Sequence, residues 1–129
     1  MLRQLVSDES PSPSEEKSMP AKILQINFKF RASTTDYQNL CKSVAEAFAA
    51  VPGLRWKIWL LNEHEKEAGG IYLFESEQAV NDYLSGPLVA QVKGNPALYD
   101  VSVKAFDVMA DVTAITRGPV PAMADFASA

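Results

Sequence analysis

The chain has very little of the chemistry that metals, disulfides and nucleotides require. Its 129 residues include one cysteine, Cys41, and one histidine, His64. A single cysteine excludes an intramolecular disulfide, and a lone histidine cannot supply the several ligands of a zinc site. The sequence also lacks a GxGxxG or similar phosphate-binding loop. We therefore expect neither a bound metal nor a nucleotide cofactor.

Long apolar runs and an excess of positive charge are missing as well. No segment approaches the roughly 18 consecutive apolar residues of a membrane span, and the opening MLRQLV is too short for a signal peptide. The formal net charge of −4 argues against nucleic acid, whose phosphates call for a basic patch. These features predict a cytoplasmic protein that binds neither nucleic acid nor membranes.

Composition divides the chain into one domain and two tails. Residues 1–20 are rich in Ser, Pro and Glu, so they cannot bury enough apolar surface to offset the entropy of ordering. We expect residues 1–20 to be a disordered tail and the proline-rich residues 118–129 a flexible one. Residues 21–117 then form a single domain, and the apolar content of 47% is ordinary for a globular protein.

The apolar residues follow two periods within this domain. Alternation of apolar and polar residues predicts strands over residues 22–30, 54–61, 67–75 and 99–109. Apolar residues at helical spacing predict a helix after the cap residues at 33–36 and a second helix after Ser76. A further short helical piece is predicted over residues 88–93. The predicted order is β-α-β-β-α-β, which is typical of a ferredoxin-like α+β fold with a four-stranded antiparallel sheet.

Two helices can cover only one face of such a sheet. Whichever face they cover, the other keeps a large apolar patch, and such a patch usually marks an interface. The sequence therefore predicts a homodimer that packs sheet against sheet. Between the two sheets we expect a cavity with aromatic walls and a few polar groups, which would suit a small molecule.

The hairpin from Pro52 to Phe74 holds both tryptophans, the histidine and a Gly-Gly pair. Trp56 and Trp59 are three apart, so they point to opposite faces of their strand. We expect Trp56 under the helices, and Trp59 with Lys57 on the face toward the partner. His64 falls in an exposed turn, whereas Gly69 and Gly70 indicate a bulge or a close approach of another group. Cys41, on the apolar helical stripe, is expected to be a small buried hydrophobe.

Four segments carry a resemblance to a known family: LQINFKF, PGLRWKIW, EAGGIYLF and VKAFDV. At these spacings the chain resembles the YdhR-like monooxygenase family over residues 20–117. That family belongs to the dimeric α+β barrel superfamily, which includes antibiotic-biosynthesis monooxygenases. The resemblance implies a ferredoxin-like subunit in a dimeric α+β barrel. It also implies oxygenation of a small aromatic or polyphenolic compound by molecular oxygen, without a metal or flavin.

Oxygenation without a cofactor requires a base or charge-stabilising donor and a dry cavity that holds the substrate ring. Seven residues are candidates for these roles. The candidate catalytic residues are Asn27, Lys57, Tyr72 and Lys104, and the candidate substrate-binding residues are Trp56, Trp59 and Phe106. In a purely structural interpretation, the aromatic residues are dimer core and the lysines are solvated. In an alternative function, the protein is a non-catalytic small-molecule-binding module that holds a hydrophobic metabolite in the same cavity. An isomerase would need a positioned acid or base, for which Lys, Tyr, Asp and Glu are the available types.

Overall fold

The computed structural model describes residues 20–120, in which Ala21–Val108 forms one compact unit. Its elements are β1 (Lys22–Phe30), α2 (Thr34–Ala49), β2 (Leu54–Asn62), β3 (Glu67–Phe74), α3 (Glu77–Leu84), α4 (Pro87–Gly94) and β4 (Leu98–Asp107). The predicted β-α-β-β-α-β order is confirmed, with the second helical region divided into α3 and α4. A short helix, α5 (Ala110–Ile115), belongs to the separate unit that includes Met109. The predicted tails fall almost wholly outside the described residues.

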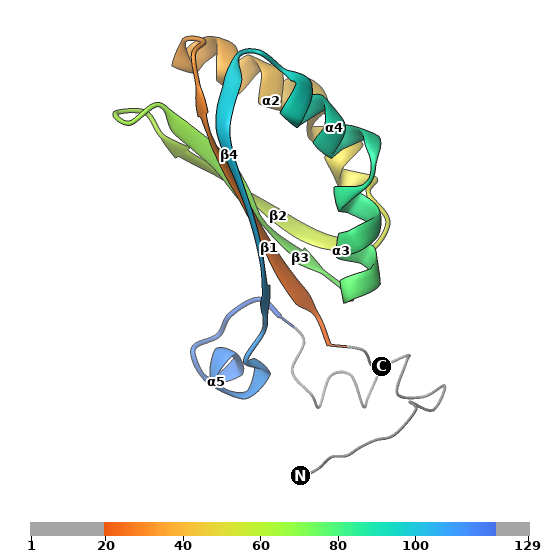
Figure 1. The fold of residues 1–129 in the computed structure, drawn as a ribbon. Coiled ribbons are helices and arrows are strands. Elements are labelled where there is room, and N and C mark those ends of the chain that lie inside the picture. Colours follow the sequence, from red (N-terminus) through yellow and green to blue (C-terminus); the bar gives the residue numbers. More distant parts are fainter. Residues whose placement is uncertain (1–19, 121–129) are drawn as a thin grey trace. The chain divides into compact units, whose positions relative to one another are not determined.

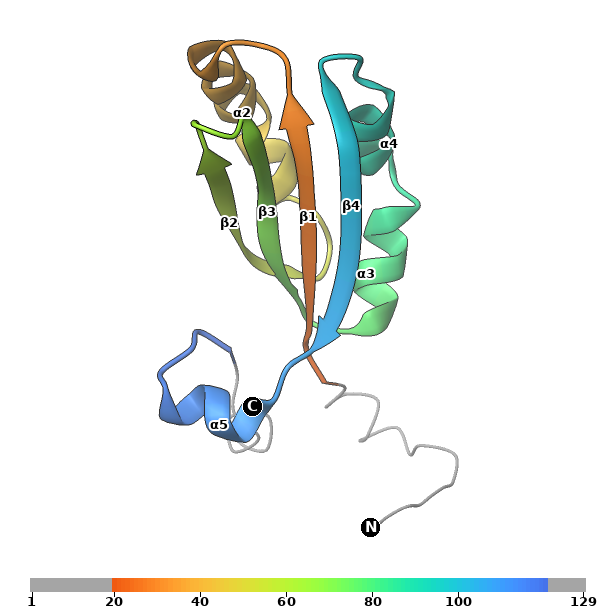
Figure 2. The same ribbon diagram turned by 60° about the vertical axis from the view of Figure 1, so that its left-hand side comes forward.

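The four strands form one antiparallel sheet in the order β2-β3-β1-β4, which Figure 2 shows from its open side. The helices α2, α3 and α4 lie on one side of the sheet (Figure 1). This arrangement is the ferredoxin-like α+β fold that the sequence predicts. Within residues 20–120, no helix is long and apolar enough to cross a membrane.

The helices begin at the cap residues that the sequence indicates. The Ser33 side chain accepts a hydrogen bond from the Asp36 amide at 3.0 Å, and Ser76 accepts one from the Ala79 amide at 3.2 Å. Each serine thereby satisfies one of the amides that a helix N-terminus leaves without an intrahelical partner. Pro87 occupies the first turn of α4, where a missing amide hydrogen is tolerated, and this separates α4 from α3.

The core lies between the sheet and the helices, and aromatic residues dominate it. Leu24, Ile26, Phe28 and Phe30 of β1 alternate toward the helices and are buried. They meet further buried aromatic side chains from α2, β3 and α3: Tyr37, Phe48, Tyr72, Phe74 and Tyr83. Because each buried aromatic side chain contributes about 1.5–3 kcal/mol of transfer free energy, this layer fixes how α2 and α3 seat on the sheet.

The strand register decides which side chains share a face of the sheet. One row across β2, β3, β1 and β4 consists of Lys57, Tyr72, Leu24 and Ala105. Since Tyr72 and Leu24 are buried in the core, this row faces the helices. The adjacent row consists of Trp56, Leu73, Ile23 and Phe106, and it lies on the opposite face. We call this opposite side, which also carries Ile58 and Ile71, the open face.

Two predictions about the hairpin are therefore wrong. Trp56 lies on the open face and not under the helices, and Lys57 with Trp59 lies on the helix side and not on the open face. Alternation within a strand establishes that Trp56 and Trp59 are on opposite faces, yet it does not say which face is covered. A register shift between Leu54 and Trp56 adds a further change of phase at the start of β2.

Candidate functional site

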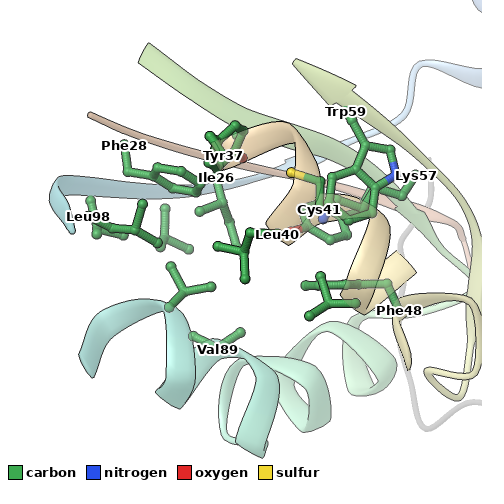
Figure 3. A pocket seen from close by; sticks show the side chains of 16 residues that line it. Ile26, Phe28, Tyr37, Leu40, Cys41, Phe48, Lys57, Trp59, Val89 and Leu98 are labelled. Atoms are coloured by element: carbon green, nitrogen blue, oxygen red, sulfur yellow. The ribbon is translucent and has the colours of Figure 1, made fainter. Parts of the chain in front are cut away.

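A small cavity lies between the sheet and the helices α2 and α4. It encloses about 60 Å³ and is walled mainly by apolar side chains such as Ile26, Val44 and Val89. Four polar or titratable side chains also line it: Tyr37, Cys41, Lys57 and Tyr72. Lys57 and Trp59 lie together on one side of the cavity, and Phe28 and Leu98 lie across from them (Figure 3). The cavity is thus an apolar chamber with a few polar groups, the usual form of a small-molecule site.

The Lys57 amine is surrounded by three aromatic rings. Its Nζ lies 3.4 Å from the centre of the Trp59 ring, 3.6 Å from that of Phe48 and 4.8 Å from that of Tyr72. We call these three rings the aromatic cage. Phe48 comes from α2, whereas the other two come from the sheet, so the cage exists only when α2 is seated on the sheet. Ring faces attract an ammonium group electrostatically.

Burial favours the neutral form of this amine. Removal from water lowers the pKa of Lys57 from 10.5 to about 7, and the nearby Cys41 only partly opposes this change. No ion pair joins Lys57 to a carboxylate within residues 20–120. Near neutral pH a substantial fraction of this amine is therefore neutral, so it can accept a proton from a ligand in the cavity.

The Gly-Gly pair of β3 makes this arrangement possible. A Cβ on Gly69 would lie 1.9 Å from the carbonyl oxygen of Ile26, so the predicted close approach is confirmed and its partner is β1. A Cβ on Gly70 would lie 2.7 Å from Cε of Lys57 and 3.3 Å from Cε1 of Tyr72. Gly70 thus leaves the space through which the Lys57 side chain reaches the cage.

Tyr72 of the aromatic cage is joined by a hydrogen bond to a second buried tyrosine, Tyr83. The Tyr83 hydroxyl of α3 donates to the Tyr72 hydroxyl at 3.1 Å, and both side chains lie deep in the core. Burial is the main reason that the pKa values of both hydroxyls are raised. Both tyrosines therefore stay protonated through the neutral range. Tyr72 has a fixed orientation beside Lys57 because Tyr83 anchors its hydroxyl.

A second pair of polar groups comes from consecutive turns of α2. Burial raises the pKa of Tyr37, and a hydrogen bond with Cys41 raises it further. Cys41 is half-buried and lines the cavity, so it is less deeply buried than the sequence predicts. Tyr37 also stacks on Phe30, with ring centres 4.9 Å apart, which holds this end of α2 against β1.

The seven candidate residues fall into two groups on opposite sides of the sheet. Lys57, Trp59 and Tyr72 lie together at the cavity. The other four lie on the open face: Asn27, Trp56, Lys104 and Phe106. Asn27 accepts a hydrogen bond there from Gln25 at 3.0 Å. His64 lies in the exposed turn between β2 and β3, as predicted.

Two cavity residues were missed as site residues at the level of sequence. Phe48 completes the aromatic cage, and Tyr37 brings a phenol to the cavity wall. Both lie on the apolar stripe of α2, a pattern that indicates core in general and does not distinguish a cage residue from packing. The Gly-Gly pair was the available signal, because it indicated a close approach on β3.

The strand order and the helices on one side of the sheet define a ferredoxin-like α+β protein, with a half-buried amine beside an apolar cavity. Residues 23–119 match the family model described as "Putative mono-oxygenase ydhR". The chain belongs to this family. No curated protein matches it by sequence.

Three solved structures share the fold. NE2512 of Nitrosomonas europaea, a protein of unknown function, is 16% identical with a TM-score of 0.61, over 72% of this chain and 93% of that one. SnoaB of Streptomyces nogalater, a cofactor-independent oxygenase, is 15% identical with a TM-score of 0.57, over 69% and 93%. The haem-degrader MhuD of Mycobacterium tuberculosis is 23% identical with a TM-score of 0.55, over 69% and 97%. At these identities the likeness shows the fold alone.

Proposed function

We propose that this protein is a cofactor-independent monooxygenase that oxidises a small phenolic compound in the cavity beneath α2. The family supports an oxygenase, and the fold is shared with SnoaB, which is described as a cofactor-independent oxygenase. The observation that carries the proposal is the Lys57 amine, whose pKa is lowered to about 7 and which faces an apolar cavity through an aromatic cage.

In the proposed reaction Lys57 acts as the general base. Its neutral amine takes the phenolic proton, and the resulting ammonium stays beside the phenolate and stabilises it in a site with little water. The ring carbon para to the phenolate then adds molecular oxygen, and the resulting peroxide anion takes the proton back from the Lys57 ammonium. Loss of water from the hydroperoxide gives a quinone, so one oxygen atom enters the product and the other leaves as water. The substrate supplies all four electrons.

The size of the cavity limits the substrate to a small ring system. An apolar cavity of about 150 Å³ accommodates benzene, whereas this one encloses about 60 Å³. A ring therefore enters only when part of the wall moves. Trp59 on the edge strand β2 is 37% exposed and Leu40 of α2 is 41% exposed, so these two side chains form the part of the wall nearest to solvent.

We also propose that the open face forms a two-fold homodimer, the dimeric α+β barrel that the family resemblance implies. Ile58 and Phe106 support this proposal, because about half of each apolar side chain is exposed on that face. Asn27 and Lys104 then lie between the two sheets. A catalytic role for either residue requires a ligand in that space and stays a prediction.

Oxygen consumption by the purified protein tests the proposed reaction. With monocyclic phenols, labelled molecular oxygen should place one labelled atom in a quinone product. The Lys57→Met variant should lose about 10²–10⁴-fold in rate, whereas Lys42→Met, on the exposed surface of α2, should retain full activity. An absence of turnover across the panel, or equal rates for wild type and Lys57→Met, would contradict the proposal.

A non-catalytic binding module is the second candidate, and the apolar walls of the cavity favour it. Such a protein would bind the same phenols and quench the fluorescence of Trp59, which forms part of the cavity wall, with no product. The same samples therefore distinguish the two functions, because only the oxygenase converts quenching ligand into quinone.

A further inference from the structure

The environment of Lys57 differs from that of the other lysines whose contacts are defined. Lys22 is paired with Asp107, Lys29 donates to the Glu65 carbonyl and Lys66 donates to the Ala32 carbonyl. Lys66 also lies over the ring of Phe30, at 4.7 Å from its centre. Of these four lysines, Lys57 lies against three rings and borders the cavity. A lysine amine that is held in an apolar site without a carboxylate is arranged as a nucleophile.

The groups that face this amine from the surrounding elements leave it free to react. From α2 they are the Tyr37 phenol and the Cys41 thiol, and from β3 the Tyr72 phenol. The cavity walls contributed by α4, β1 and β4 are apolar. We propose that Lys57 forms a reversible imine with small aldehydes or ketones that enter this cavity, which makes the cavity a covalent carbonyl-binding site.

The bond changes involve only the amine and the carbonyl compound. The nitrogen lone pair of Lys57 attacks the carbonyl carbon, and a C–N bond forms as the carbonyl π bond becomes a hydroxyl group. The hydroxyl then leaves as water, which carries away both hydrogens of the amine, and a C=N bond remains. No oxidant or reductant is needed, and hydrolysis reverses the step.

Four features of the site favour imine formation. A cavity of about 60 Å³ is too small for a fused ring but fits a carbonyl carbon with a short substituent. The apolar walls keep out the water that hydrolyses imines. Gly70 leaves room beside Cε of Lys57, which a larger residue would fill. The lowered pKa of Lys57, about 7, increases the neutral fraction of the amine over that of an ordinary lysine.

Reductive trapping of the wild-type protein tests this proposal. The protein is incubated near pH 7 with propanal and cyanoborohydride in the absence of oxygen, and propylated lysines are located by peptide mapping. Because an ordinary lysine titrates near 10.4, we expect Lys57 to be labelled at least ~10-fold faster than exposed lysines. Lys42, on the exposed side of α2, is the matched reference in the same sample. The α-amino group of the chain also reacts, and peptide mapping separates it.

Two variants strengthen the assignment. Lys57→Arg should remove the fast label, and Gly70→Ala should slow it because the new Cβ displaces the lysine side chain. Labelling of Lys57 no faster than that of Lys42 overturns the proposal. Since the comparison is made within one wild-type sample, it does not depend on whether a variant folds. The two proposals have separate readouts. Imine formation is measured by lysine labelling in the absence of oxygen, and oxygenation is measured by the quinone product.

Discussion

The Lys57 amine lies 3.4 Å from the centre of the Trp59 ring, with the two residues on the same face of strand β2. A separation of two residues along a strand places both side chains on one face. The ring attracts the ammonium form, while burial favours the neutral amine. Burial lowers the pKa of Lys57 to about 7, and the nearby Cys41 only partly opposes this change. Because this pKa is close to neutral pH, any change in the burial of the amine alters the fraction that is charged.

Trp59 should report the protonation of its neighbour. In a Trp56→Phe variant, which leaves Trp59 as the remaining tryptophan, fluorescence should change with a single midpoint near pH 7. Adding Lys57→Met should abolish the transition. The control is His64→Gln, because histidines ordinarily titrate in this range, and it should leave the midpoint unchanged. A transition that follows His64 and not Lys57 would contradict the assignment.

The buried amine should also make stability depend on pH. Between about pH 7 and 10 the unfolded chain holds the Lys57 proton and the folded chain does not, so the free energy of unfolding rises with pH. Below the folded pKa the full penalty of burying the ammonium remains. The stability gained by Lys57→Met relative to wild type should therefore be larger near pH 6 than near pH 9, by about 2–3 kcal/mol. Urea unfolding measures this, with Lys42→Met as the pH-independent control.

Substitution of Gly70 should disturb the amine without removing it. The Cβ of Gly70→Ala would lie 2.7 Å from Cε of Lys57, so the side chain must leave its present path. We expect a loss of about 1–2 kcal/mol of stability and a Lys57 midpoint that moves toward the ordinary lysine value. Gly94→Ala is the matched control, since nothing lies within 4 Å of its Cβ. An unchanged midpoint in Gly70→Ala would contradict the proposed path.

Local features of the fold were predictable because they depend on near neighbours. The Ser33 and Ser76 caps, the alternation of β1 and the exposed turn at His64 all follow from residues a few positions apart. Their order then specifies the ferredoxin-like fold, since few topologies suit that order. The family resemblance agrees with the match over residues 23–119.

The division of the candidate residues between two faces was not predictable from the same patterns. Alternation within one strand does not say which of its faces points toward the helices. For β2 this depends on its pairing with β3, whose register shifts between Leu54 and Trp56. A lysine in a strand is ordinarily exposed, so Lys57 was assigned to a solvent-facing rim or an interface. Its amine contacts Phe48 of α2, which lies on a different element, and only the folded chain reveals this approach.

The hydrogen bond between Tyr83 and Tyr72 should appear as an energetic coupling. Tyr83→Phe leaves the buried Tyr72 oxygen without its donor, and Tyr72→Phe leaves the Tyr83 hydroxyl without its acceptor. Each single change should cost about 1–2 kcal/mol, and the double variant should cost at least about 0.5 kcal/mol less than their sum. Urea unfolding of the four proteins measures the coupling. Strictly additive losses would show that the two hydroxyls do not depend on each other.

The open face should hold the dimer together. Phe106 is 46% exposed on β4 and Ile58 is 49% exposed on β2, so both edges of this face present apolar side chains. Phe106→Asp or Ile58→Asp would bury a charge without a partner, and each should weaken dimerisation by about 2 kcal/mol or more. Sedimentation at micromolar concentration measures this, with Asn39→Asp on the exposed surface of α2 as the control. A wild-type monomer would refute the dimer, and a dimer that survives both substitutions would place its interface elsewhere.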